Sequence, residues 1–161
     1  MTAPSENIIS RIIITQLAKG TDMPYNLLLL ADPSIEMINR YISQAQVFIA
    51  TLNQQRIGVY VLLPLPGNKA EIKNIAVAEA FQGKGIGKFL LEDAAQKAKA
   101  LGFHTLLIGT GNSSITQLYL YQRCGFEITS LVQHFFTDNY PEPIIENGIP
   151  CKHLVILSKQ L

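Results

Sequence analysis

The sequence predicts a mixed α/β fold in which a central, mostly antiparallel sheet is flanked by helices. Segments rich in β-branched residues alternate with segments whose apolar residues recur at helical spacing. Two strand segments in the first half are separated by a short polar turn, which is typical of an antiparallel hairpin. Farther along, a strand, a long helix and another strand follow one another, which favours a parallel crossover unit.

The first half of the chain contains four predicted strands and two short helices. The strands cover residues 11–16, 46–52, 57–63 and 71–78, and the helices cover 23–31 and 33–43. Ile35, Ile38 and Ile42 recur at helical spacing, and Pro33 suits the first turn of the second helix. The polar turn at 53–56 predicts that the second and third strands form a hairpin.

The second half begins with the strongest helical pattern in the chain, over residues 85–101. Gly102 stands where a helix terminator belongs, and Gly125 likewise stops a second helix over 114–124. Strands are predicted over 103–108, 126–131 and 153–157, so the element order is βααβββαβαββ. The connection over 132–150 is rich in proline, which argues against a long helix or strand there.

Composition limits the class of protein. The chain has 161 residues, 48% hydrophobic and 16% charged, which predicts one globular domain over residues 1–161. Its 13 basic and 12 acidic residues form no basic run, so a nucleic-acid partner is not expected. The apolar stretch over 57–65 is too short for a membrane span, and residues 1–10 do not resemble a signal peptide, which favours the cytoplasm. Cys124 and Cys151 are expected to be reduced, and no metal site is expected.

A glycine-rich turn over residues 82–88 lies between a predicted strand and the start of the long helix. The first N–H groups of a helix have no internal partner and carry partial positive charge, so this context suits a phosphate group. The spacing does not fit the dinucleotide-binding motif, because Lys88 stands where the last glycine is required. It does not fit the P-loop either, because Phe89 follows Gly87-Lys88. An ordinary tight corner between strand and helix is the alternative.

The segment NIAVAEAFQGKGIGKFLL, with Gln82, Gly85 and Gly87 in a Q-x-x-G-x-G pattern, resembles the GNAT superfamily of N-acetyltransferases. LYLYQRCGFE resembles a later helix of that family, and the predicted element order is also similar. The resemblance implies that acetyl-CoA is the cosubstrate, with the pantetheine arm along residues 75–77 and the pyrophosphate at 82–88. The implied coenzyme-binding residues are Ile75, Ala76, Val77, Gln82, Gly83, Lys84, Gly85, Ile86, Gly87, Lys88, Asn112, Ser114 and Tyr121.

Acetyl transfer to an amine requires a proton donor for the departing thiolate, and Tyr121 matches the family position that implies this role. A phenol with a pKa near 10 is protonated at neutral pH. Tyr119, two positions earlier, points to another face and is interpreted as a core residue. An N–H near Ala76 or Val77 would stabilise the oxyanion if that strand separates from its neighbour.

Three further assignments leave alternatives open. Glu71 is the chosen general base, but Asp138, Glu142 or a water chain could serve. The alternative for Glu71, which the residue pattern favours, is a solvated or salt-bridged carboxylate at the start of a strand. Asn112 and Ser114 would either contact the coenzyme or cap the following helix.

The segment over residues 134–148 is predicted to form part of the amine-binding wall. It combines aromatic with acidic residues and contains no Lys or Arg, which favours a cationic substrate. Its candidate substrate-binding residues are His134, Asp138, Tyr140 and Glu142. The alternatives are a cover for a sheet edge or a subunit contact; homodimers are common in the resembled family.

The resulting hypothesis is an N-acetyltransferase that moves an acetyl group from acetyl-CoA to a primary amine of a small molecule by direct attack. The residues leave open the identity of the amine. One alternative is a non-catalytic acyl-CoA sensor or partner-binding module on the same fold. Another is an acetyltransferase that acts on a protein or peptide amine.

Overall fold

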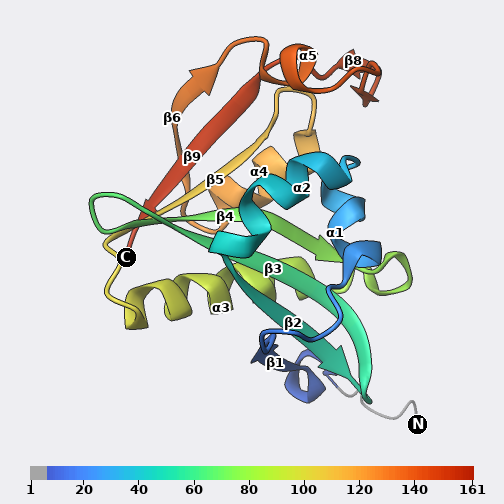
Figure 1. The fold of residues 1–161 in the computed structure, drawn as a ribbon, viewed down its shortest axis with the longest axis vertical. Helices are drawn as coiled ribbons and strands as arrows, with labels where there is room; N and C mark the ends of the chain where they lie inside the picture. Colours follow the sequence, from blue (N-terminus) through green and yellow to red (C-terminus); the bar gives the residue numbers. More distant parts are fainter. Residues whose placement is uncertain (1–6) are drawn as a thin grey trace, which may run out of the picture.

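The fold is built around a sheet of seven strands in the order β1-β2-β3-β4-β5-β9-β6 (Figure 1). The computed structural model describes residues 7–161. Residues 1–6, which belong to the segment for which no signal peptide is expected, lie outside the described residues. Strands β4 and β5 pair in parallel and the other neighbours in the large sheet pair antiparallel, so the predicted fold class is confirmed.

The observed elements follow the predicted order, with small additions in the proline-rich connection. The strands are β1 (Ile13–Gln16), β2 (Gln46–Leu52), β3 (Gln55–Leu65), β4 (Lys69–Val77), β5 (Thr105–Gly111), β6 (Glu127–Val132), β7 (Ile145–Glu146), β8 (Ile149–Pro150) and β9 (Leu154–Gln160). The α-helices are α1 (Tyr25–Ala31), α2 (Ile35–Tyr41), α3 (Ile86–Ala100), α4 (Ile115–Arg123) and α5 (Phe135–Asn139). Short 3-10 turns cover Ile8–Arg11, Ile42–Gln44 and Glu79–Phe81.

The hairpin of β2 and β3 has a tighter turn than the predicted 53–56. Asn53 and Gln54 alone form it, with φ angles of 49° and 67°. A two-residue turn with both residues in the left-handed region matches the twist of the flanking strands. Strand β3 also runs past its predicted end through Pro64, which is tolerated because β3 pairs only with β4 beyond Leu62.

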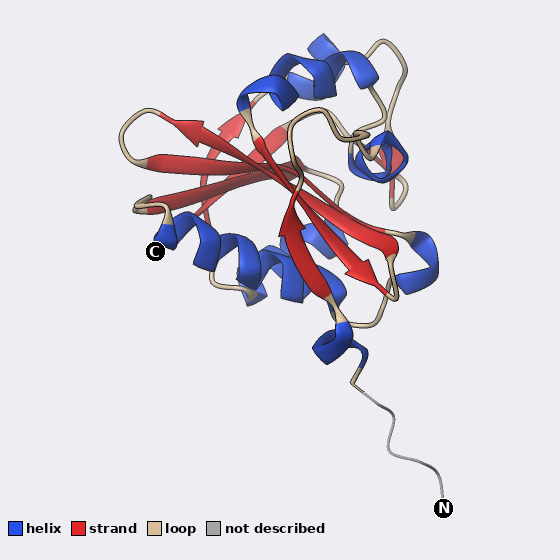
Figure 2. Cartoon of the chain, turned by 60° about the horizontal axis from the view of Figure 1, so that its bottom comes forward, coloured by secondary structure: helices blue, strands red, loops and turns tan. Residues whose placement is uncertain are grey.

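Helices cover both faces of the sheet (Figure 2). Helices α1 and α2 pack on one face around a cluster that includes Leu28, Ile38 and Val59. Helix α3 packs on the other face, where Leu90 and Ala94 are fully buried in the larger cluster, and α4 contributes to the same cluster. The two faces of the sheet are therefore covered by different helices.

The ends of the helices largely follow the predicted signals. Gly102 has a φ of 90°, and the N–H of Phe103 donates to the carbonyl of Ala98, which closes the carboxyl end of α3. Helix α2 begins later than predicted. Ser34 is its N-cap and accepts a bond from the N–H of Met37, so Pro33 precedes the cap instead of occupying the first turn.

A β-bulge in β4 changes which residues face which helices. The register with β3 shifts between the pairs Leu62–Ile72 and Val61–Asn74, so one additional residue, Lys73, is inserted in β4. Before the bulge, Ile72 faces the α3 side; after it, Asn74 contacts α1 and α2. The bulge places a polar side chain on a face that a strict alternation would have made apolar.

Two expectations concern membranes and cysteines. Within residues 7–161, no helix is both long and apolar enough to cross a membrane. Cys124 and Cys151 are both free thiols.

Candidate active site

The sheet opens between its two parallel strands. Pairing between β4 and β5 ends at Ile72 and Ile108, although β4 continues to Val77 and β5 to Gly111. In a regular parallel sheet these remaining residues would be joined by a ladder of hydrogen bonds. A free N–H for an oxyanion was expected only if β4 separates from its neighbour, and the register shows this separation.

The register also determines which backbone groups face the opening. The N–H of Ala78 donates to the carbonyl of Ile57 at 2.8 Å, so these two residues form a hydrogen-bonded pair of the β3–β4 ladder. Because hydrogen-bonded and non-hydrogen-bonded pairs alternate along antiparallel strands, the polar groups of Val77 and Ile75 point away from β3. They point to the side where β5 has separated.

This alternation decides between the two predicted oxyanion donors. The backbone of Ala76 faces β3, so its N–H is not available in the opening, and Val77 is the candidate. The side-chain amide of Gln82 donates to the carbonyl of Val77 at 2.9 Å, which leaves the N–H of Val77 for a ligand. Gln82, predicted to contact the pyrophosphate, thus ties the glycine turn to the end of β4.

The glycine turn lies directly beyond β4 and leads into α3. Gly83 and Gly85 have φ angles of 73° and 81°, a region that L-residues rarely occupy, and Gly85 is the N-cap of α3. Ile86, Gly87 and Lys88 form the first turn of α3, whose N–H groups have no partner within the helix. The geometry is that of an anion-binding turn.

The side chains of the turn differ in what they can contribute. Ile86 is 1% exposed in the core, so a ligand could meet only its backbone. Lys84 is exposed, and Lys88 is paired loosely with Glu92 at 3.8 Å. A Cβ added at Gly87 would lie 3.6 Å from Leu120, an ordinary contact, so packing alone does not require glycine there.

Tyr121 closes the carboxyl end of α4. Its carbonyl accepts from the N–H of Phe126, and Gly125 has a φ of 90°, which together form a Schellman motif. The rings of Tyr121 and Phe126 lie 6.3 Å apart, the hydrophobic contact that accompanies this motif. The Schellman motif therefore accounts for the spacing between Tyr121 and Gly125-Phe126 without any catalytic role for the tyrosine.

The phenol of Tyr121 is nevertheless unusual. Tyr121 is 5% exposed, and its hydroxyl makes no hydrogen bond to any residue that the structure describes. Burial raises the pKa of the phenol above its ordinary value, so the protonated form is favoured. A hydroxyl without a protein partner is available to donate to a ligand.

Tyr119 does not occupy the core position that was predicted for it. It is 66% exposed, because α4 turns only Tyr121 and its helical neighbours toward the sheet. The prediction that the two tyrosines point to different faces was correct, but the second face is solvent.

Asn112 and Ser114 are engaged with the proline-rich connection rather than with a helix cap. The amide oxygen of Asn112 accepts from the N–H groups of Lys152 and His153, and its nitrogen donates to the carbonyl of Pro150. Ser114 is the N-cap residue of α4, but its hydroxyl donates to Glu146 at 2.8 Å. The predicted side-chain caps are therefore absent, and both residues anchor the same segment.

Glu71 lies on β4 before the bulge and is ion-paired. Its carboxylate is 3.6 Å from the ammonium group of Lys73, which also lies over the ring of Tyr41 at 5.5 Å. This arrangement corresponds to the salt-bridged alternative for Glu71. To act as a base, the carboxylate of Glu71 would have to accept a proton while it is paired with the ammonium group of Lys73.

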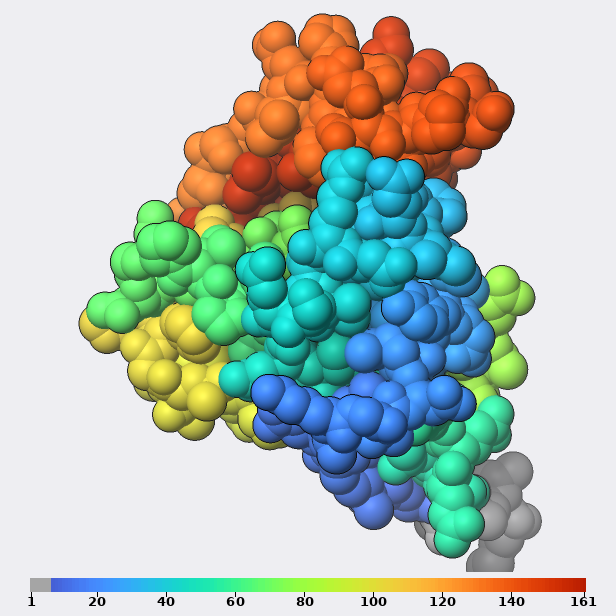
Figure 3. Space-filling model, in the orientation of Figure 1, coloured from blue at the N-terminus to red at the C-terminus, as the bar shows by residue number. Residues whose placement is uncertain are grey.

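The segment over residues 133–151 is an ordered cap over the end of β5. It contains α5 and the hairpin of β7 and β8, and it forms a lobe against α1 and α2 at one end of the molecule (Figure 3). The hydroxyl of Tyr140 donates to Asp32 at 2.9 Å, which joins residues that are 108 positions apart. Asn147 donates to the carbonyl of Ser113 at 2.9 Å, which fixes the hairpin to the start of α4.

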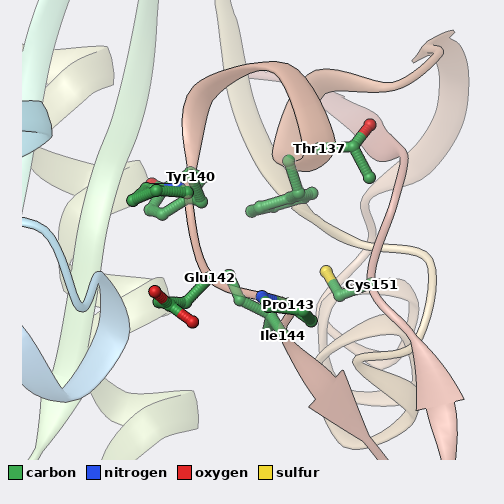
Figure 4. A pocket seen from close by; sticks show the side chains of 8 residues that line it. Thr137, Tyr140, Glu142, Pro143, Ile144 and Cys151 are labelled. Atoms are coloured by element: carbon green, nitrogen blue, oxygen red, sulfur yellow. The ribbon is translucent and has the colours of Figure 1, made fainter.

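A pocket of about 160 Å³ lies within this segment (Figure 4). Tyr140 and Glu142 line it on one side, and Cys151 lies on the other. The thiol of Cys151 packs over Gly111, at a position that a Cβ there would occupy, so the pocket adjoins the end of β5. The remaining lining residues are Phe136, Thr137, Pro141, Pro143 and Ile144.

His134 and Asp138, the other two residues predicted for the substrate wall, do not line this pocket. The N–H of His134 donates to a ring nitrogen of His153 at 2.9 Å, and the two rings lie 5.0 Å apart. Asp138 is exposed on α5. No group of three or more metal-ligating side chains occurs in residues 7–161.

Sequence reasoning missed a polar cluster on the α1/α2 side of the opening. Asn74, which is 4% exposed, donates to the carbonyl of Leu28 at 3.0 Å and to the hydroxyl of Tyr41 at 3.3 Å. Asp32 meets Tyr140 nearby. The one available signal was Asn74, a polar residue inside an apolar strand, because a buried amide requires hydrogen-bond partners.

The sequence and the fold of this chain are both similar to those of known acetyltransferases. A family model described as an acetyltransferase (GNAT) domain matches residues 43–128. A GNAT family acetyltransferase from Elizabethkingia anophelis, with acetyl-CoA bound, is 52% identical, with a TM-score of 0.92 over 94% of this chain and 99% of that one. An IAA acetyltransferase from Bacillus cereus is 47% identical, with a TM-score of 0.90 over 93% of this chain and 99% of that one. The Bacillus subtilis protein "Uncharacterized N-acetyltransferase YvbK" is 50% identical over 84% of this chain and 88% of its own.

Proposed function

Because the chain belongs to the GNAT acetyltransferase family, we propose that it transfers the acetyl group of acetyl-CoA to a primary amine of a small molecule by direct attack. The observation that carries this proposal is the opening between β4 and β5, with the glycine turn at its edge and the unpartnered hydroxyl of Tyr121 on the α3 side. The bound acetyl-CoA of the relative from Elizabethkingia anophelis supports the choice of coenzyme.

The coenzyme occupies the opening on the side of α3 and α4. The pyrophosphate binds the N–H groups at the start of α3, where the helix dipole favours an anion. The pantetheine arm runs along residues 75–77 as an added strand would, and it pairs with the free backbone groups of Ile75. The carbonyl of Val77 already accepts from Gln82, so Val77 contributes only its N–H, at the thioester end. Adenine dinucleotides lack this arm, so the enzyme should discriminate against them.

The reaction needs no covalent enzyme intermediate. The neutral amine attacks the thioester carbon, and the oxyanion of the tetrahedral intermediate accepts a hydrogen bond from the N–H of Val77. The C–S bond then breaks, and the thiolate takes a proton from the hydroxyl of Tyr121. The proton lost by the amine passes to Glu71, to Glu142 or to water, and Tyr121 regains its proton from solvent.

The acceptor approaches from the opposite side, where α1, α2 and the cap segment meet. Tyr140 and Glu142 line the pocket there, and the bond from Tyr140 to Asp32 holds the two walls together. The pocket combines the carboxylate of Glu142 with aromatic and aliphatic side chains, which suits a small amine with an apolar body.

Acetyl-CoA is expected to raise the thermal midpoint of the protein. A ligand at 100 times its dissociation constant stabilises the folded state by about 2.7 kcal/mol, or roughly 5–10 °C for a chain of this size. Differential scanning fluorimetry with acetyl-CoA and with NAD at equal concentration measures the effect. A shift with NAD, or none with acetyl-CoA, would contradict the coenzyme assignment.

A thiol-release assay separates the enzyme from a non-catalytic sensor on the same fold. The panel should contain small amines, peptides with a free amino terminus, and IAA, the compound in the name of the relative from Bacillus cereus. Release of CoA that depends on a small amine supports the proposal. A thermal shift without turnover on any acceptor would favour the sensor, and turnover on peptides alone would favour a protein substrate.

Charge reversal tests whether the cap segment contacts the acceptor. Glu142→Lys is expected to raise KM for a cationic amine about 3- to 10-fold, because Glu142 lines the pocket. Asp138→Lys should have a smaller effect, since Asp138 is exposed outside the pocket. Steady-state kinetics of both variants, with Glu127→Lys on β6 as a control, provides the test. If KM and turnover are unchanged in both variants while coenzyme binding is constant, the segment is not the acceptor wall.

A further inference from the structure

A half-buried carboxylate without a cationic partner lies where the cap segment meets α1. Asp32 accepts two hydrogen bonds, from the hydroxyl of Tyr140 at 2.9 Å and from the N–H of Ser34 at 3.0 Å. Both bonds go to the same oxygen, Oδ1. Within residues 7–161 the other oxygen, Oδ2, has no protein partner, and no Lys, Arg or His lies within ion-pair distance of Asp32.

Asp32 carries its negative charge at the end of a helix. It is the C-cap of α1, where the carbonyl groups of the helix end carry partial negative charge. Its charge also contributes, after burial, to raising the pKa values of Tyr41 and Tyr140, so both phenols lie within its field. A cation beside Asp32 would offset both the charge of the carboxylate and the partial negative charge of the helix end. It would also lie close to the aromatic rings, whose faces attract cations.

A second unsatisfied group belongs to the same cluster. The amide oxygen of Asn74 is buried and has no hydrogen-bond partner among the described residues. Its orientation is fixed, because the amide nitrogen donates to the carbonyl of Leu28, which can only accept. The nitrogen also donates to the hydroxyl of Tyr41, whose phenol is electrostatically coupled to Asp32. The cluster therefore presents acceptors in excess of donors.

Glu71 does not supply the same charge. Its carboxylate is already paired with Lys73 at 3.6 Å, so the two side chains are together close to neutral. Asp32 is the carboxylate of this cluster whose charge is not compensated by a protein cation within the described chain. An acceptor with a positive charge would complete the site.

We propose that Asp32, held by the hydroxyl of Tyr140, binds an ammonium group of the acceptor that is not the reacting amine, which makes the substrate a diamine or a related dication. The inference rests on the proposed acetyltransferase function. The reacting nitrogen must be neutral to attack a thioester, whereas a half-buried carboxylate stabilises the protonated form of an amine beside it. The nitrogen at Asp32 is therefore a second one.

The test compares two acceptors that differ in one end group, 1,4-diaminobutane and 4-amino-1-butanol. The wild-type protein should prefer the diamine, and Asp32→Asn should lower kcat/KM for the diamine about 10- to 100-fold, mainly through KM. The amino alcohol should change less than about threefold, because it places no second cation at Asp32. The amide keeps an oxygen for the bonds from Ser34 and Tyr140, so the fold is retained. Asp22→Asn removes the same charge from an exposed loop position and serves as the matched control.

Tyr140→Phe distinguishes charge recognition from a merely structural latch. It removes the bond to Asp32 and keeps the carboxylate, so the preference for the diamine should persist. Equal loss of the preference in Tyr140→Phe and Asp32→Asn would overturn the proposal, as would the absence of a diamine preference in the wild-type protein.

Calorimetric titration of 1,4-diaminobutane into the CoA complex gives a readout that does not need turnover. Binding to the wild-type protein that weakens about 10-fold or more in Asp32→Asn supports the cation site even if no amine is acetylated, in which case the proposed function alone fails. Turnover on monoamines with no diamine binding refutes the cation site and leaves the proposed function intact.

Discussion

Replacing Tyr121 by phenylalanine is expected to lower the turnover number by about 10- to 1000-fold, with the affinity for acetyl-CoA nearly unchanged. The substitution removes one hydroxyl group that has no hydrogen-bond partner among residues 7–161, so the folded state loses little. The packing of the ring on Phe126 is kept. A large loss of turnover would therefore come from the missing proton donor.

The measurement is a single-turnover assay in which chemistry is rate-limiting, together with the acetyl-CoA thermal shift and the thermal midpoint of the free variant. Tyr119→Phe is the matched control, because Tyr119 lies on the same helix and is 66% exposed. Burial raises the pKa of Tyr121, so the phenol stays protonated when the pH rises through the ordinary tyrosine pKa of about 10. The turnover number should therefore not fall at that pH through loss of this proton. Wild-type turnover in Tyr121→Phe would leave the tyrosine with its role in the Schellman motif alone.

The second large effect is expected at the glycine turn, where Gly85→Val should abolish the thermal stabilisation by acetyl-CoA. Gly85 has a φ of 81°, and an added Cβ would meet no atom within 4 Å, so the strain is conformational rather than steric. A left-handed L-residue costs about 1–2 kcal/mol, and a β-branched one is especially unsuited to that region. We expect the variant to relax away from the conformation in which the N–H groups would meet the pyrophosphate at the proposed coenzyme site.

Because this strain also lowers the stability of the free protein, a control with equal strain is needed. Gly20 has the same φ of 81° and likewise nothing within 4 Å of an added Cβ, but it lies in the loop between β1 and α1. Both valine variants should melt a few degrees lower than the wild-type protein. Only Gly85→Val should lose the response to acetyl-CoA, and a full response in that variant would remove the turn from the coenzyme site.

The order of the main elements, the carboxyl ends of α3 and α4 and the glycine turn follow from the sequence by itself. These features depend on neighbours within a few positions. The Ile-rich and Val-rich runs specify strands, and Gly102 and Gly125 end α3 and α4 because glycine adopts the left-handed conformation without a steric cost. Gly83 and Gly85 predict an anion-binding turn for the same local reason.

The tertiary structure alone decided how these parts form a site. The bulge at Lys73 and the end of β4–β5 pairing after Ile72 set which N–H faces the opening, and no periodicity in the sequence reports a change of register. Asp32 and Tyr140 are 108 positions apart and meet because the sheet order brings the cap segment back over α1. Their hydrogen bond, and the uncompensated charge beside it, are properties of chain packing rather than of either local sequence. Local patterns encode backbone conformation, whereas the partners of a buried polar group depend on which distant segments the sheet places next to it.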